Sequence, residues 1–493
     1  MTTHILGSRF ARLVVVGALA SGAAIVQAAA GEPGAFRYDA SNVDVAAHWA
    51  ARATLANAVM FSGLGEPIVM SASEWDDVLR HAGYVTRPPT PGLPMVGGVY
   101  AGGDPRFAAE PDFGKLETLR WDQASFDRTL DPGAQAWALI KITSPEFHLN
   151  FHESKDDKRI ALMMLSQAEA EAGVLEERLR NADGRFAALS PDGRLAEPKP
   201  ADQPAVLWGV SSLILAATSA RDDYWHGAYR DLVDPNDWRD LADAALAAVQ
   251  KLPPETPAER AIAIEALGRF ALATGDAAQR EAALGLAREH ADALTDLGEA
   301  SLEDVSLAVY GLVEAGRLLN DAAYADAAAE LFKTRLLPRW NEDLGAFVPG
   351  EIGESFAYTP RTLGALAAAL NALRWHGPAD LAEEAERRYP ALFETILVRA
   401  GLLRSSPLPL VPAEYRKDRP DAHFAHPALP APESASVAPV FSGEVRHEDG
   451  AWRVSDPLLR TADAMFLANM LVMPHEGRAD PFLPEDGLAS LSR

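Results

Sequence analysis

The chain has 493 residues, with 45 Lys and Arg against 70 Asp and Glu, so its formal net charge is −25 at pH 7. This acidity excludes a nucleic-acid binder that works by phosphate neutralisation, because such a protein needs a basic face. The sequence has no cysteine, which excludes disulfides, thiolate zinc sites, iron–sulfur clusters and a cysteine nucleophile. At 48% hydrophobic residues the chain can bury a large core, in one big domain or several smaller ones.

Residues 1–30 have the pattern of a secretory signal. Arg9 and Arg12 precede an apolar run over 13–26, and three alanines ending at Ala30 supply the small residues that a signal peptidase needs. We therefore expect cleavage after Ala30 and an exported, periplasmic mature protein without an integral membrane span. The alternative is an uncleaved anchor, although the run is weakly apolar for a permanent span.

From about residue 134 onward the sequence predicts one helix after another. The run Thr256-Pro257-Ala258-Glu259 combines an N-cap, a proline at the first helical position and a capping-box acid. Comparable capping residues open the helices that follow: Asp276, Ser301, Asp321 and Thr359.

Two kinds of helix alternate along this region. The first kind is apolar around most of its circumference and is expected over 205–220, 257–274, 302–319 and 360–375. The second kind is amphipathic and is expected over 237–250, 277–296, 322–335 and 379–400. A helix that is apolar nearly all round must be buried on most sides, whereas an amphipathic helix covers it from outside. The alternation therefore predicts two concentric rings of helices.

An acidic turn with glycine, followed by an aromatic residue, recurs at 181–186, 341–347 and 447–452 and indicates short hairpin tips. Helix pairs interrupted by such turns resemble the (α/α) toroid superfamily of six-hairpin glycosidase-like barrels. The resemblance covers roughly residues 134–403 and a closing helix near 457–472, and it matches no individual family. A helical solenoid is the competing interpretation, but the unequal spacing of the apolar helices favours a toroid.

The resemblance implies a mainly α fold, an α/α toroid of helical hairpins with short β-hairpin turns and long irregular N- and C-terminal segments. The expected organisation, segment by segment, is a signal peptide at 1–30, N-terminal helices and ordered loops at 31–133, the toroid body at 134–403, a Pro-rich loop at 404–442, and a short hairpin, closing helix and tail at 443–493.

The first candidate site precedes the apolar helix that starts near residue 360. In toroid families, loops at one end of the inner helices build the active-site cleft and the catalytic groups are usually Asp or Glu, so the resemblance places the site there. The candidate catalytic residues are Glu351, Glu354 and Tyr358, and the candidate substrate-binding residues are Arg361, Trp340 and Asp343. Because Arg361 would add a fixed donor to a positive helix end, the site favours anionic sugars such as uronates. A solvated loop is the alternative.

A second candidate cluster holds Asp222, Asp223, Trp225 and His226. Aromatic rings can stack on pyranose faces while acids bond hydroxyls. This cluster follows an inner helix, whereas Arg361 precedes one, so we expect the two at opposite ends of the ring. His148 and His152 are weak candidates for a divalent metal because their spacing could put both imidazoles on one helix face. No third ligand is evident, and no cofactor is predicted.

The leading functional hypothesis is an exported carbohydrate-active enzyme, a hydrolase or lyase, acting on an acidic poly- or oligosaccharide. The alternative is a non-catalytic periplasmic binding or interaction protein, including one in a redox or metal-handling assembly. An enzyme should gather two carboxylates and aromatic rings in one deep pocket. A ring plugged by apolar side chains would favour the alternative. In either case we expect a small-molecule or oligosaccharide ligand.

Overall fold

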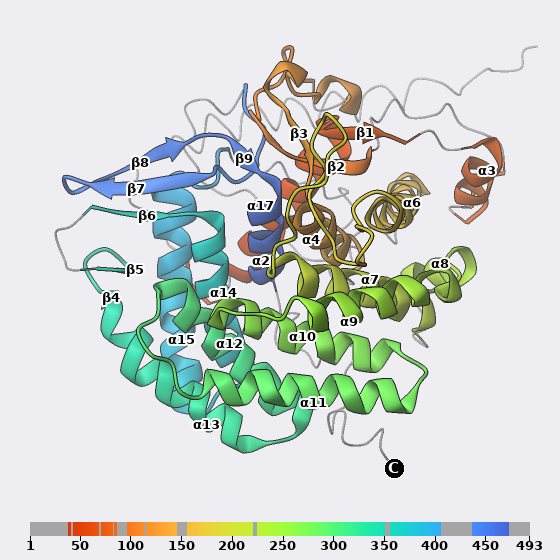
Figure 1. Ribbon diagram of the computed structural model, residues 1–493. Helices are drawn as coiled ribbons and strands as arrows, with labels where there is room; N and C mark the ends of the chain where they lie inside the picture. Colours follow the sequence, from red (N-terminus) through yellow and green to blue (C-terminus); the bar gives the residue numbers. More distant parts are fainter. Residues whose placement is uncertain are drawn as a thin grey trace, which may run out of the picture.

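The computed structural model describes residues 38–40, 43–68, 71–81, 83–85, 96–112, 115–144, 155–219, 224–350, 355–405 and 436–472. Across these residues the protein is mainly α, with small sheets along one side of the helical body (Figure 1). The predicted signal sequence and most of the Pro-rich loop lie outside the described residues. The fold class predicted from the sequence is confirmed.

Within the described chain, six helices form a closed inner ring. In ring order they are α4 (Pro132–Ile142), α7 (Asp202–Thr218), α10 (Pro257–Ala273), α12 (Leu302–Leu319), α14 (Pro360–His376) and α17 (Thr461–Met470). Each packs against the next, and α17 packs back against α4. These helices are buried around most of their circumference, as the sequence predicted for the apolar set.

An outer set of helices covers this ring, and each packs mainly against one inner helix. The pairs run α6 (Lys155–Glu177) on α4, α9 (Arg239–Lys251) on α7, α11 (Ala277–Leu294) on α10, α13 (Ala322–Leu331) on α12, α15 (Ala379–Leu392) on α14, and α2 (Val43–Leu55) on α17. In Figure 1, α11 and α13 run along the lower edge of the molecule. The predicted alternation of inner and outer helices is confirmed.

The helix starts follow from local side-chain chemistry. Thr256 accepts the Glu259 N–H at 3.2 Å, and Glu259 accepts the Thr256 N–H at 3.0 Å, which completes the predicted capping box. Asp276, Ser301 and Thr359 likewise cap α11, α12 and α14. Such caps satisfy backbone donors that would otherwise have no partner.

The remaining short elements complete the helical body. They are the helices α3 (Ala72–His81) and α8 (Tyr224–Leu232), the π-helical turns η1 (Ala56–Phe61), η5 (Phe332–Leu336) and η7 (Phe393–Arg399), and the 3₁₀ turns η2 (Leu116–Thr118), η3 (Gln123–Ser125), η4 (Pro235–Trp238) and η6 (Leu337–Arg339).

Two small antiparallel sheets lead directly into inner helices. The first is built from β1 (Gly65–Pro67), β2 (Val96–Gly103), β3 (Asp127–Leu130) and β9 (Leu459–Arg460), with β2 pairing all the others. The second is built from β6 (Phe356–Tyr358), β7 (Glu444–Glu448) and β8 (Ala451–Asp456). Because β3, β9 and β6 precede α4, α17 and α14, both sheets flank the same end of the ring.

The predicted hairpin tips are present at each of the three turns. The second is the hairpin of β4 (Trp340–Asn341) and β5 (Ala346–Phe347), and the third joins β7 to β8. The first closes with an isolated bridge between Arg180 and Phe186. The strands β2 and β3 were not predicted, because that region was expected to hold only ordered loops.

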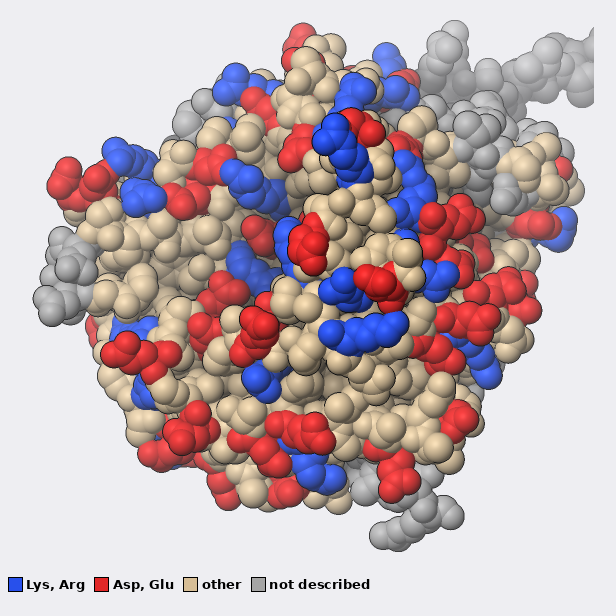
Figure 2. Space-filling model, in the orientation of Figure 1, with Lys and Arg blue, Asp and Glu red and all other residues tan. Residues whose placement is uncertain are grey.

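Described helices carry no segment that is both long and apolar enough to cross a membrane. On the face shown in Figure 2, Asp and Glu gather over the right and lower margins, in the regions of α8 and α11, with Lys and Arg interspersed nearer the centre. This distribution agrees with the net charge of −25.

Two glycines provide a test of how tightly the rings pack. A Cβ at Gly311 in α12 would lie 2.8 Å from Ala261 Cα in α10, whereas a Cβ at Gly285 in the outer helix α11 would meet nothing within 4 Å. Gly311→Ala should lower the free energy of unfolding by about 1–3 kcal/mol through overpacking. Gly285→Ala should raise it by roughly 0.5–1 kcal/mol through helix propensity. Urea denaturation measures both, and equal effects would contradict close packing of α10 on α12.

Candidate active site

The starts of the inner helices gather at one end of the ring. The Ala258 N–H donates to Asp304 Oδ1 at 3.2 Å, which joins the starts of α10 and α12. Arg361 Nε donates to Glu303 Oε1 at 3.0 Å, which joins the starts of α14 and α12. We call this end the mouth and define it by its charged side chains: Asp131, Lys199, Asp202, Glu259, Glu303, Asp304, Arg361, Arg460 and Asp463.

Two carboxylates approach each other over the first turn of α4. A Cβ at Gly133 would lie 2.9 Å from Asp202 Oδ1 and 3.0 Å from Asp131 Oδ1, so both side chains occupy the space beside this glycine. Asp131 caps α4 by accepting the Ala134 N–H at 3.1 Å, and its Oδ2 lies 3.5 Å from Lys199 Nζ. Asp131 therefore has partners for its charge.

Asp202 has much less compensation. It is 9% exposed, and its buried Oδ2 has no hydrogen-bond partner among the described residues. Burial raises the pKa of this carboxyl from 3.8 to about 7; the charges of Asp131 and Glu259 raise it too, and those of Lys199 and Arg361 lower it. Asp202 is thus a carboxyl group that can hold or release a proton near neutral pH.

Arg361 lies in the mouth, as the sequence suggested, but its guanidinium is engaged. Besides its bond to Glu303, it sits over the Phe466 ring, with Cζ 4.2 Å from the ring centre. Its side chain is 21% exposed. Arg361 therefore links the start of α14 to Glu303 of α12 and to Phe466 of α17, and these contacts already occupy its guanidinium.

Asp463, in the first turn of α17, completes the mouth. Burial raises the pKa of its carboxyl, with the charges of Glu303 and Asp131 adding to the effect and that of Arg361 opposing it. Among the described residues, no hydrogen bond or ion pair of this side chain is found. The neighbouring Arg460 pairs with Asp456 at 2.8 Å.

Beneath the mouth, aromatic side chains fill the ring. Trp137 packs edge-on against Trp208 and Phe466, with ring centres 5.5 and 5.0 Å apart. All three are buried at 2% exposure or less. The centre of the ring is thus closed, and a ligand at the mouth would lie across the helix starts.

The other residues of the first predicted cluster lie away from these carboxylates. Tyr358 is buried on β6, packs against Trp452 and donates its hydroxyl to the Phe347 carbonyl. Burial raises the pKa of its phenol. Glu351 and Glu354 lie outside the described residues.

Trp340 and Asp343 belong to the β4–β5 hairpin. Trp340 is half-buried, packs against Phe347 with ring centres 4.9 Å apart, and faces the Arg388 guanidinium of the outer helix α15. Asp343 is exposed at the hairpin tip. The hairpin packs against α15, so these residues lie by the outer ring.

The second predicted cluster falls at the opposite end of the ring. Trp225 and His226 lie in α8, which follows the C-terminal end of α7. Asp222 and Asp223 lie outside the described residues, as do His148 and His152. Among the residues that are described, no group of three or more His, Asp or Glu has an arrangement that could hold a metal.

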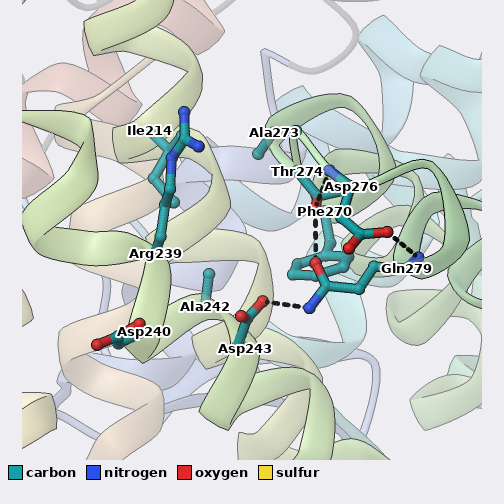
Figure 3. Close-up of a pocket in the computed structure, with 11 residues that line it drawn as sticks. Ile214, Arg239, Asp240, Ala242, Asp243, Phe270, Ala273, Thr274, Asp276 and Gln279 are labelled. Carbon is teal, nitrogen blue, oxygen red and sulfur yellow. Dashed lines mark hydrogen bonds between the residues drawn. The ribbon is translucent and has the colours of Figure 1, made fainter.

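A cavity of about 470 Å³ lies near this opposite end, between the α7–α9 and α10–α11 hairpins (Figure 3). Phe270 and Ile214 form its apolar floor. On its rim, Gln279 accepts from the Thr274 hydroxyl at 2.7 Å and donates to Asp243 at 3.1 Å. The charged side chains that line the cavity are those of Arg239, Asp240, Asp243 and Asp276. None of the candidate site residues predicted from the sequence lines it.

Solved structures that are similar to this chain include a D-mannose isomerase and a sugar epimerase. A D-mannose isomerase has 12% identity and a TM-score of 0.39, over 65% of this chain and 85% of that one. A sugar epimerase from a ruminal bacterium has 12% identity and a TM-score of 0.45, over 81% of this chain and 98% of that one. No protein-family model matches the sequence, and neither does any curated protein. These likenesses carry no activity over to this chain.

Sequence reasoning missed Asp131, Asp202 and Asp463. Asp131 and Asp202 are separated by a helical hairpin, and Asp463 comes from the far end of the chain. The feature in the sequence that could have identified them is their position, because each is an acidic residue at the start of an inner helix.

The raised pKa of Asp202 predicts that the stability of the folded protein depends on pH. The folded protein keeps this proton up to about pH 7, whereas an unfolded chain loses it near pH 3.8. The resulting stabilisation is complete below pH 3.8 and is lost as the pH rises to 7. Asp202→Asn lacks this loss, so its stability relative to wild type should rise by roughly 2–3 kcal/mol between pH 5 and pH 8. Urea denaturation at both pH values measures it.

The matched control is Asp240→Asn, at an exposed position on the cavity rim. Its stability relative to wild type should not change over the same range. A pH-independent difference for Asp202→Asn would contradict the electrostatic account.

Proposed function

We propose that the protein is a carbohydrate-active enzyme whose reaction takes place at the mouth, with Asp202 as proton donor and Asp131 as its carboxylate partner. The observation that carries this proposal is the buried, unpartnered Oδ2 of Asp202 beside Asp131. Glycosidic bond cleavage uses such a pair, one carboxyl group that holds a proton near neutral pH and one that is ionised. Export of the protein remains a prediction from the sequence.

In this proposal Asp202 donates its proton to the oxygen of the breaking glycosidic bond. Asp131, whose carboxylate contacts Lys199 and accepts the Ala134 N–H, assists attack at the anomeric carbon, directly or through a water. Gly133 supports this arrangement, since a side chain there would collide with both carboxylates.

Hydrolysis finds more support than a lyase reaction. Lyase chemistry abstracts a proton beside a uronate carboxylate, so the site must neutralise that carboxylate with a cation. The described cations of the mouth are already paired: Lys199 with Asp131, Arg361 with Glu303, and Arg460 with Asp456. The acidic substrate expected from the sequence depends on Arg361 being available, and it stays a prediction.

Non-catalytic binding is the second candidate. The buried Trp137, Trp208 and Phe466 close the centre of the ring, which favours a shallow binding surface over a deep cleft. The cavity at the opposite end, which is lined in part by Asp240, Asp243 and Asp276, adds a second place where a small ligand could bind. In this case a ligand would bind without being converted.

Substitutions at the carboxylate pair separate the two candidates. Asp202→Asn and Asp131→Asn should each lower kcat by roughly 100- to 10,000-fold, because each removes a proton-transfer group. Asp343→Asn, at the exposed hairpin tip, should leave kcat unchanged. The measurement is release of reducing ends, with absorbance of unsaturated products, from a panel of neutral, amino and uronate oligosaccharides. If the wild type bound these oligosaccharides without converting them, the non-catalytic binding function would be supported. If it showed no binding and no turnover, the proposal would be refuted.

A further inference from the structure

Two glutamines lie near the starts of the inner helices α4 and α7, and both are fully buried at 0% exposure. Gln135 in α4 donates its amide to the Asp131 carbonyl at 3.2 Å. Gln203 in α7 donates its amide to the Lys199 carbonyl at 2.9 Å. In each case the acceptor lies four residues earlier in the chain, so the two helix starts are built in the same way.

Each amide also pairs in both directions with one backbone residue outside its helix. Gln135 accepts the Val99 N–H and donates to the Val99 carbonyl, both at 2.7 Å. Gln203 accepts the Phe186 N–H and donates to the Phe186 carbonyl, both at 2.9 Å. Because each amide uses its acceptor and its donor on a single partner, its position and its orientation are both fixed.

The two partner segments meet at Leu130, the residue before Asp131. On one side Leu130 pairs with Tyr100 of β2, the strand that the first glutamine holds. On the other side its N–H donates to the Leu189 carbonyl at 2.9 Å and its carbonyl accepts the Leu189 N–H at 2.8 Å. Leu189 follows closely on the residue that the second glutamine holds. Both amides are therefore tied to the backbone from which Asp131 projects.

The same bonds reach Asp202. This residue precedes Gln203, and its N–H donates at 3.3 Å to the Lys199 carbonyl, the acceptor that the Gln203 amide also binds. The Lys199 ammonium in turn lies 3.5 Å from Asp131 Oδ2. The backbone at both carboxylates is thus held by buried amide hydrogen bonds.

We propose that Gln135 and Gln203 are positioning residues, which hold the Asp131 and Asp202 carboxylates side by side for proton transfer at the mouth. Neither amide can contact a ligand that lies over the helix starts, because both are fully buried. Catalytic groups must keep their productive geometry closely, and a misplacement of about 1 Å can lower a rate by about 100-fold. This inference rests on the proposed function, because it names residues that set the geometry of the same site.

The first measurement compares Gln135→Met and Gln203→Met with the control Gln167→Met, all in the full chain. Gln167 is equally buried but lies in the outer helix α6, where its amide donates to the Val59 carbonyl at 3.4 Å. With an oligosaccharide that the wild type converts, the first two substitutions should lower kcat by roughly 10- to 100-fold and leave KM nearly unchanged. The control should keep the wild-type kcat. Urea denaturation establishes that each variant is folded under the assay conditions.

The second measurement needs no substrate. Asp202→Asn is introduced into the wild type and into the Gln203→Met protein, and its effect on stability is compared between pH 5 and pH 8. The charges that act on Asp202 are those of Asp131, Lys199, Glu259 and Arg361. Loss of the Gln203 bonds admits water to Asp202, so the pH-dependent effect should shrink by about half or more. It should keep its full size in the Gln167→Met protein.

A purely structural role predicts a different result. Lower stability at every pH, with kcat and the pH-dependent effect unchanged, would overturn the inference and leave the proposed function standing. A wild type without turnover of any oligosaccharide would overturn the proposed function, and with it the catalytic role of this arrangement, even where the pH dependence shows that Gln203 holds Asp202. If Gln203→Met does not fold, Gln203→Glu replaces it in the kcat measurement, because it keeps the acceptor for the Phe186 N–H and, when ionised, lacks the donor.

Discussion

Closure of the ring by α17 is the constraint on which the rest of the structure depends. This helix comes from the far end of the chain and fills the gap between α14 and α4. Two buried amides fix it: Asn371 donates to the Met470 carbonyl at 3.0 Å, and Asn469 donates to the Trp137 carbonyl at 2.9 Å. Buried amide N–H groups need acceptors, and these two bonds form when the three helices are in register. Gly364 lets α14 approach Phe466, where a Cβ would lie 2.7 Å from the ring.

Closure also explains why the mouth is acidic. Parallel inner helices bring all their N-terminal ends together, and each end favours negative charge by about 0.3–1 kcal/mol. Acids in first turns, such as Glu303 and Asp463, are therefore expected on structural grounds alone. Asp202 departs from this rule. A helix start should lower the pKa of a carboxyl group, yet burial raises that of Asp202 to about 7, because removing a charge from water costs more than the helix end returns.

The sequence predicted the rings well because the signals were local. The apolar inner helices, their amphipathic partners and caps such as Thr256 can each be identified within one window of the chain. The sheet around β2 could not be found in this way, since its pairing with β9 joins Gly102 to Arg460. That strand also needs glycine where its partner approaches, because a Cβ at Gly102 would lie 2.3 Å from the Leu459 carbonyl oxygen. A strand so rich in glycine lacks the usual alternation. Of the predicted site residues that the structure describes, Arg361 lies at the mouth. Which acids meet there could not be predicted, because that depends on the order of the helices around the ring.

The aromatic plug restricts how the mouth can act. Trp137 lies six residues after Asp131, which at a rise of 1.5 Å per residue puts it about 9 Å down the ring axis. The carboxylates and the plug are thus separated by less than two helical turns. A sugar ring is itself several ångströms across, so a ligand would rest over the helix starts, with Phe466 and Arg361 near its underside. A ligand bound there would bury little apolar surface, so the charges at the rim would contribute mainly to its specificity. Under the proposed function, the side chains of Asp202 and Asp463 would therefore help to determine which ligand the mouth accepts.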